Sequence, residues 1–423
     1  MSAMNPVAGK GGNKYVPFDE RTGENSVVFF TRDLSEEGLK KIYDKVSSVL
    51  EGRVAVKLHT GEAEGPNIIP RPWVKELLAS RLPDAAIIET NTYYEGSRYT
   101  TEEHRKTLEI NGWTFCPVDI TDADGVTTLP VKGGKWFDEM HVGKTLPTYD
   151  SLLVLTHFKG GSNKNIGIGC ADGRIGKKEI HTQAGSVNMW SIAEEELMER
   201  ISESTKATVD YFAPHVCFIN TMRNMSVDCD CAGPEADPVV TPDIGFVASL
   251  DILAADNACI DLIYNLPSGG GKALIERVET RHGLRQLSYM KELGMGNDRY
   301  TLIDLDHDEK EITAAEAVNN ADVIEKVLGN CIVLAQSLHA LGKLLVIIGS
   351  SIADVDMLRV THGDTAGGYI GDEVSAYVGV YNVIGHGNAV STRVLDHIPR
   401  KADIVAACDM YGSRESIRHF VFL

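Results

Sequence analysis

The sequence has few cysteines for its length and no apolar run long enough to cross a membrane. Eight cysteines are spread over 423 residues, and only Cys229 and Cys231 lie close together. This spacing does not suit a disulfide framework, so we expect reduced thiols and a cytoplasmic location. The most apolar stretch, residues 331–348, is interrupted by Gln, His and Lys, so it predicts no membrane-spanning helix.

Basic residues are scarce relative to acidic ones. Lys and Arg number 41 against 60 Asp and Glu, which gives a formal net charge of −19. A field of this sign repels phosphate backbones and anionic membrane surfaces, so neither nucleic acid nor a membrane is an expected partner. Hydrophobic residues at 43% and charged residues at 24% are ordinary values for a globular protein, which excludes disordered, collagen-like and coiled-coil classes.

The length predicts two domains, or one large domain with an addition. Residues 1–25 are rich in Gly, Asn and charge and lack the apolar core of a signal peptide, so they predict a flexible tail. From residue 26 to residue 308, short apolar runs alternate with helical patterns. Such a rhythm predicts an α/β domain with a mostly parallel sheet and helices on both faces. Residues 309–423 predict a smaller α/β domain. The strands expected in the first domain are residues 26–30, 54–58, 86–89, 114–118, 151–156, 215–220, 244–249 and 300–305.

Polar side chains follow several of these predicted strands. His59 comes directly after one strand, and His157 and Lys159 follow another. Because ligands bind beyond the carboxyl ends of parallel strands, we expect these residues to converge with His181 on one edge. Imidazoles are common ligands of transition metals, so His59 and His157 are candidate metal ligands. The alternative, that each histidine only satisfies loop backbone groups, stays open.

Cys229 and Cys231 flank Asp230 in a CxC motif. Thiolates are soft ligands that suit iron, zinc or copper(I), but two of them do not complete a tetrahedral site. Cys170 is a candidate for a further ligand. The chain lacks the CxxCxxC run of a ferredoxin-type cluster, so a single transition metal, iron or zinc, and a structural role stay open beside an iron–sulfur cluster.

Residues 159–178 combine six glycines with five Lys or Arg residues. Glycines allow backbone amides to approach a ligand and lysines supply positive charge, so this segment predicts a site for a small anion. Lys164, Asn165 and Lys177 are the candidates for holding it, and Lys159 and His181 are the candidates for catalysis. The order GxxxxGK[ST] is missing, so binding of a nucleoside triphosphate is not supported. A flexible surface loop is the alternative.

Many separate segments, among them VVFFTRDL, VAVKLHTGE, IIETNTYY, YDSLLVLTHFKG and SVDCDCAG, closely resemble the domain of unknown function 362 family. The resemblance covers residues 26–306, and members of the family are commonly described as having an iron–sulfur centre. Two features differ: the ferredoxin-type cysteines are missing, and GGSN replaces a longer Gly-rich passage with a further His. The functional positions that the resemblance implies are His59, His157, Lys159, Asn165, His181, Asp228, Cys229 and Cys231.

Together these patterns predict a metal- or iron–sulfur-binding α/β protein that acts as a redox or metal-assisted enzyme on a small anionic substrate. The metal ligands would be His59, His157, Cys229 and Cys231. The alternative is a non-catalytic module that binds metal or an anion. The sequence leaves open whether the protein is an enzyme, although oxidoreductase chemistry is the class these residues favour, and it leaves open a homo-oligomer.

Overall fold

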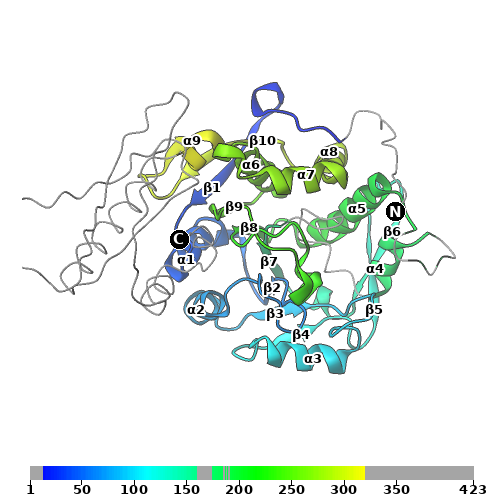
Figure 1. Cartoon of the computed structure of the whole chain (residues 1–423). Coiled ribbons are helices and arrows are strands. Elements are labelled where there is room, and N and C mark those ends of the chain that lie inside the picture. The colour runs from blue at the N-terminus through cyan, green and yellow to red at the C-terminus, as the bar shows by residue number, and fades with distance from the viewer. Residues whose placement is uncertain (1–12, 160–173, 184–185, 187, 189–190, 320–423) are drawn as a thin grey trace, which may run out of the picture. The chain divides into compact units, whose positions relative to one another are not determined.

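The structure is a computed structural model that describes residues 13–159, 174–183, 186, 188 and 191–319 (Figure 1). Lys164, Asn165 and Cys170, for which the sequence predicts roles, lie outside these residues, as does most of the predicted C-terminal domain. Among the described helices, none combines the length and apolar character needed to cross a bilayer.

Nine strands form one mixed, mostly parallel sheet, which confirms the predicted α/β class. In order across the sheet they are β11 (Lys310–Ile312), β10 (Arg299–Asp304), β1 (Asn25–Thr31), β9 (Gly245–Ser249), β8 (Val216–Met222), β7 (Ser151–His157), β2 (Val54–Lys57), β3 (Ala86–Glu89) and β4 (Val118–Ile120). Strand β9 is antiparallel to both of its neighbours, and β11 is antiparallel to β10. The other neighbouring strands are parallel.

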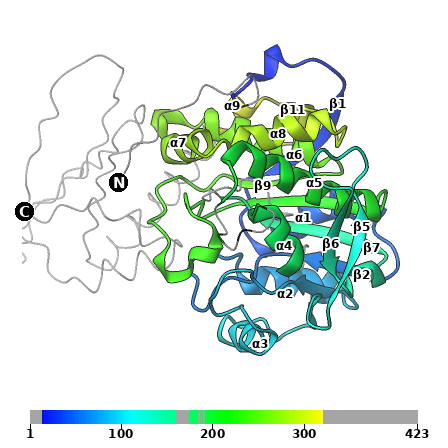
Figure 2. The same cartoon turned by 90° about the vertical axis from the view of Figure 1, so that its right-hand side faces the viewer.

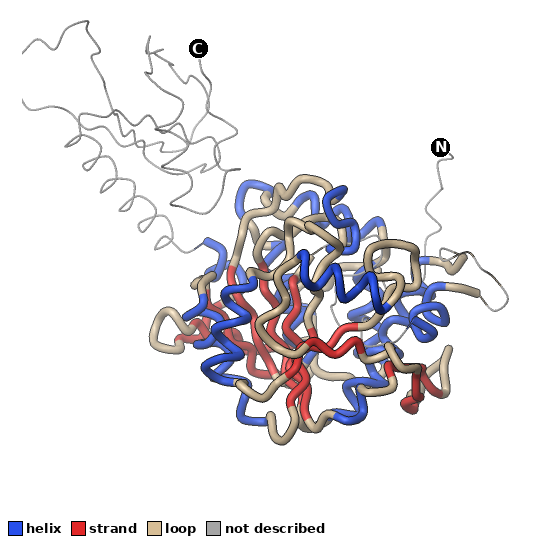
Figure 3. The backbone as a smooth tube through the Cα atoms, turned by 90° about the horizontal axis from the view of Figure 1, so that it is seen from below, coloured by secondary structure: helices blue, strands red, loops and turns tan. Residues whose placement is uncertain are grey.

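Helices cover both faces of this sheet, and two hydrophobic cores result (Figure 3). The central strand β7 is buried along its whole length, and its side chains alternate between the cores. Leu152 and Val154 belong to one core, whereas Leu153 and Leu155 belong to the other. Continuous burial of this kind explains why the strand reads as an unbroken apolar run.

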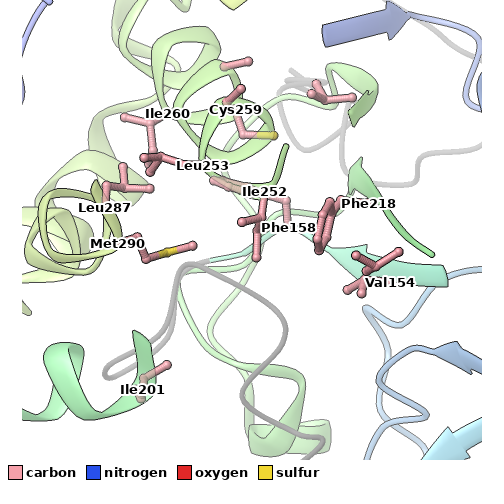
Figure 4. Close-up of a cluster of buried hydrophobic side chains, with 14 of the residues drawn as sticks. Val154, Phe158, Ile201, Phe218, Ile252, Leu253, Cys259, Ile260, Leu287 and Met290 are labelled. Atoms are coloured by element: carbon pink, nitrogen blue, oxygen red, sulfur yellow. The ribbon is translucent and has the colours of Figure 1, made fainter. Parts of the chain in front are cut away.

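The first core is covered by α5 (Glu194–Phe212), α6 (Ile252–Tyr264), α7 (Lys272–Thr280) and α8 (Gly283–Glu292), with contributions from α4 (Arg174–His181) and α9 (Ala314–Asn319). Figure 4 shows Val154 and Phe218 of the sheet in this cluster, with Leu253 of α6 and Met290 of α8. The second core is covered by α1 (Glu36–Val46), α2 (Arg71–Arg81) and α3 (Thr101–Ile110).

Side-chain caps begin several of these helices. Ser35 accepts a hydrogen bond from the Gly38 amide at the start of α1, and Thr100 forms a capping box with Glu103 at the start of α3. Such caps satisfy amides that have no partner inside the helix, and each is worth about 1 kcal/mol.

Three parts of the fold differ from the expectation. The strand predicted at residues 114–118 lies instead at residues 118–120, because pairing with β3 starts at Pro117, whose carbonyl accepts the Ile87 amide. Helices α4 and α7 were not predicted. The hairpin of β5 (Val126–Pro130) and β6 (Glu139–Gly143) was also missed; its connection is held by the buried carboxylate of Glu203, which accepts from three backbone amides.

The described part of the N-terminal segment packs on α6. The Arg21 side chain is buried and donates to the Asp261 carboxylate at 2.5 and 2.9 Å. Tyr15 also donates to Asp261, and its ring stacks on Tyr264. These residues are therefore not the flexible tail that the sequence predicts.

The sheet continues past the predicted domain boundary at residue 308, because β11 pairs with β10. The division of the chain into domains stays a prediction.

Asn220, which follows the apolar part of β8, points to α6 rather than to the neighbouring loops. Its side-chain amide donates to Asp256 at 2.9 Å and lies 3.3 Å from the Cys259 sulfur. Asp256 is buried, and its second oxygen has no hydrogen-bond partner among the described residues. Burial, with a smaller contribution from Asp251, raises the pKa of Asp256 to about 7, although the Asn220 amide opposes this shift.

Replacing Asp256 by Asn should change how stability depends on pH. The pKa of Asp256 is higher in the folded chain than the value of about 3.9 expected in the unfolded chain, so ionisation between about pH 4 and 7 destabilises the native protein. Relative to Asp256→Asn, the free energy of unfolding of the native sequence should fall by a few kcal/mol across this window, since each pKa unit corresponds to about 1.4 kcal/mol. Urea unfolding at pH 4, 5.5 and 7 measures the difference, and parallel pH curves would contradict it.

Candidate functional site

The candidate site lies at the carboxyl ends of four neighbouring strands, β8, β7, β2 and β3. These strands are parallel, so the segments that follow them meet at one edge of the sheet. Figure 2 shows α4 beside this part of the sheet, next to β6 and α5. The residues that follow the strands are mostly polar and nevertheless buried, which is unusual outside functional sites.

Cys229 and Cys231 lie at the start of the turn η4 (Asp230–Glu235). The Cys231 amide is 3.5 Å from the Cys229 sulfur, the two thiols hydrogen-bond each other, and the His59 side chain hydrogen-bonds Cys229. The bond from Cys231 lowers the pKa of Cys229 most; burial opposes it, and His59 and the charge of Lys159 lower it further, so it lies well below its usual range. Both cysteines remain partly exposed.

Asp230, between the two cysteines, is held by residues from β7. Its carboxylate lies 2.9 and 3.1 Å from Nδ1 of His157, and the Lys159 ammonium donates to it. Burial would raise the pKa of Asp230, but the charges of His157 and Lys159 outweigh burial and hold it well below its usual range. The Nε2 atom of His157 lies 2.6 Å from the Arg223 carbonyl oxygen. Both ring nitrogens of His157 therefore face oxygen acceptors.

Arg98 forms the second charged centre of the site. Its guanidinium is buried and donates from Nε to Glu62 at 2.8 Å and from Nη1 to Glu89 at 3.4 Å. Tyr94 and Ser97 also donate to Glu62. Burial is the largest influence and would raise the pKa values of Glu62 and Glu89, but the charge of Arg98 together with smaller effects of other neighbours outweighs burial and lowers both. The two carboxylates thus bind one buried guanidinium.

His59 connects Arg98 with Cys229. Its Nδ1 accepts the Gly61 amide at 3.0 Å, so we assign the ring proton to Nε2. The Arg98 Nη2 atom lies 3.3 Å from that Nε2. Burial and the charge of Arg98 lower the pKa of His59, although Cys229 opposes the shift. The imidazole is therefore neutral, with an N–H available to the Cys229 sulfur.

The loop that carries His59 is fixed by two residues after α3. The Asn111 side-chain amide donates to the carbonyls of Thr60 and Glu62 at 3.0 and 2.8 Å, and the Trp113 indole donates to the Thr60 carbonyl at 2.9 Å. Gly61, inside this loop, has φ +85°, a conformation that glycine adopts without strain. The position of His59 is thus set by buried hydrogen bonds.

The structure brings five of the predicted site residues together, namely His59, His157, Lys159, Cys229 and Cys231. Lys177 lies on the β3 side of the site, where its ammonium donates to the Thr90 hydroxyl at 2.6 Å and the Asn91 carbonyl at 2.9 Å. His181 is buried at the end of α4. Asp228 is directed elsewhere, since it pairs with Arg277 of α7. The functional roles of these residues stay predictions.

Sequence reasoning did not assign a role to Arg98. The available signal was the acidic pair: Glu89 ends an apolar strand and Glu62 follows another. A carboxylate carried into a buried edge requires a cation, and Arg98 is the basic residue in the polar segment that follows Glu89. A paired cation could therefore have been sought in that segment.

The described donors do not fit a complete metal or iron–sulfur site. Among the described residues, no three His, Cys, Asp or Glu side chains are grouped as ligands. Cys229 and Cys231 supply two sulfurs, whereas the Nδ1 of His59 is engaged by the Gly61 amide and both nitrogens of His157 face oxygen acceptors. Metal binding stays a prediction of the sequence, and we derive no chemistry from it.

Replacing Arg98 by Gln should destabilise the protein most at neutral pH. The pKa of Glu89 is lower in the folded than in the unfolded chain, so this pairing stabilises the protein above about pH 4.3 and is lost as the pH falls. The variant leaves two buried carboxylates without their cation, which costs about 3–5 kcal/mol. Denaturant unfolding at pH 7 and at about pH 3 should show that the difference in unfolding free energy between the native protein and the variant becomes smaller in acid.

The exposed pair of Arg81 with Asp44 supplies the control, since Arg81→Gln should cost less than about 1 kcal/mol. A loss for Arg98→Gln as small as that of the control, or one that does not change with pH, would contradict the described pairing.

Comparisons with known proteins give a family match and distant structural similarities. Residues 54–261 match the model described as domain of unknown function (DUF362), within the range that the sequence resemblance predicted. Curated proteins give no match. The structure of the lactate racemase apoprotein from Thermoanaerobacterium thermosaccharolyticum is similar with a TM-score of 0.29 and 11% identity, over 49% of this chain and 52% of that one. A likeness of this size carries no argument about function. The family is thus confirmed for part of the predicted range: the chain carries a DUF362 domain over residues 54–261.

Proposed function

We propose that this edge of the sheet is the active site of a redox enzyme that works through the Cys229 thiolate on a small anionic substrate. The observation that carries the proposal is the environment of Cys229: a partly exposed sulfur hydrogen-bonded by His59 and Cys231, beside the ammonium of Lys159. The thiolate is the nucleophilic form of cysteine, and cations and N–H donors are the groups that favour it.

Each neighbour of the sulfur has a distinct part in this proposal. His59, kept neutral by burial and Arg98, donates its N–H to the thiolate. Lys159 adds positive charge while its ammonium also fixes Asp230. Cys231 donates its thiol to Cys229 and supplies a second sulfur for redox chemistry. Such an arrangement prepares a nucleophile before substrate arrives.

The preference for an anion rests on the segment after β7. Lys159 and the basic residues of α4, Arg174 and Lys177, come from this one segment and lie at the same edge of the sheet as β2 and β3. The Arg174 side chain donates to the Thr92 carbonyl, and its guanidinium lies over the Tyr99 ring. Fixed cations at a partly exposed edge favour an approaching carboxylate or phosphate.

Replacing Lys159 by Met should make Cys229 a weaker nucleophile. Loss of the ammonium removes a charge that favours the thiolate, so the pKa of Cys229 should rise. The measurement is the rate of alkylation of Cys229 by iodoacetamide as a function of pH, followed by peptide mass spectrometry. The midpoint of the rate–pH profile should move upward.

Lys106→Met is the matched control, because Lys106 is exposed on α3, where it pairs with the exposed Glu102. A Lys159→Met midpoint that coincides with the native one would remove Lys159 from the proposal. A native midpoint at about pH 8.5, the value for an ordinary thiol, would remove the proposed function itself.

A further inference from the structure

Cys229 and Cys231 differ from the other cysteines that the structure describes. Cys217 and Cys259 are fully buried in the two cores, and burial raises their pKa values. Burial also raises the pKa of Cys116, to about 11. Among the cysteines that the structure describes, only the CxC pair joins partial exposure to a direct contact between two thiols. The pair therefore has both the access and the mutual contact that thiol oxidation needs.

The turn that carries the pair is held at two points away from the sulfurs. Between the two cysteines, the buried carboxylate of Asp230 is fixed by His157 and Lys159. Further along the turn, Gly233 has φ +56°, and a Cβ there would lie 3.0 Å from the Glu62 side chain. The backbone is thus fixed against the β2 loop, while the Cys231 amide and the Cys229 sulfur stay adjacent at 3.5 Å.

We propose that Cys229 and Cys231 form a reversible dithiol–disulfide couple that is oxidised by a small anionic disulfide. The inference rests on the proposed function, because it assigns Cys229 as the attacking group, and it adds the class of co-substrate and the part of Cys231. A disulfide across one intervening residue closes a short ring, and strained or exposed disulfides are readily reduced again.

The exchange balances in two steps. The Cys229 thiolate attacks one sulfur of the small disulfide, so a mixed disulfide forms and one small thiolate leaves. Cys231 then loses its proton to water and attacks the Cys229 sulfur, which breaks the mixed bond and releases the second small thiolate. The protein loses two electrons, and the small disulfide gains them and becomes two thiols.

The test uses the full chain in its reduced form and glutathione disulfide as the probe. After incubation and an acid quench, remaining thiols are alkylated with N-ethylmaleimide, and intact mass and peptide mapping locate the modifications. The native protein should lose alkylation at Cys229 and Cys231 together, without a stable glutathione adduct, and dithiothreitol should restore both. Cys116, Cys217 and Cys259 should be unchanged and serve as internal controls.

Two variants separate the steps. Cys231→Ser should accumulate one glutathione on Cys229, because the second attack is missing, and Cys229→Ser should show neither product. A native protein that accumulates the glutathione adduct at Cys229 without an internal disulfide would overturn the inference while leaving Cys229 as a reactive thiol. A native protein in which neither cysteine reacts would overturn both the inference and the proposed function. The native measurement decides these outcomes even if a variant does not fold.

Discussion

The site depends on the buried carboxylate of Asp230. A carboxylate taken out of water is stable only when it is paired, and both of its partners, His157 and Lys159, come from the end of β7. This pairing fixes the turn that follows β8 at Asp230. Because Cys229 and Cys231 flank Asp230, the same ion pair places both sulfurs beside the loop of β2, where His59 lies.

A second buried charge group supports the first from the other side. Arg98 neutralises Glu62 and Glu89, and its remaining nitrogen lies against His59. In this site, buried positive and negative side chains lie next to each other, and they come from segments that follow different strands of the sheet. A buried network of this kind stabilises the fold most when all of its members are paired.

The sequence was sufficient to place His59, His157 and Cys229 on one edge, because apolar runs revealed parallel strands and such strands share their carboxyl ends. The sequence does not show which way Asn220 faces, because side chains alternate between the faces of a strand and Asn220 falls on the α6 side. The partner of each charge was not identified from the sequence. Arg98 meets Glu62 and Glu89 only after the loops of β2 and β3 fold together, so the acidic pair and the basic residue after Glu89 indicate that a cation is needed but not which residues it contacts.

The central claim is that the folded chain holds Cys229 as a thiolate at a pH where an ordinary cysteine is a thiol. The most direct measurement is the thiolate absorbance near 240 nm, recorded during a pH titration as the difference between the native protein and Cys229→Ser. Our account predicts a Cys229 signal that is already present at neutral pH and disappears in acid, well below the usual midpoint of about pH 8.5. A difference signal that develops only above about pH 8 would contradict it.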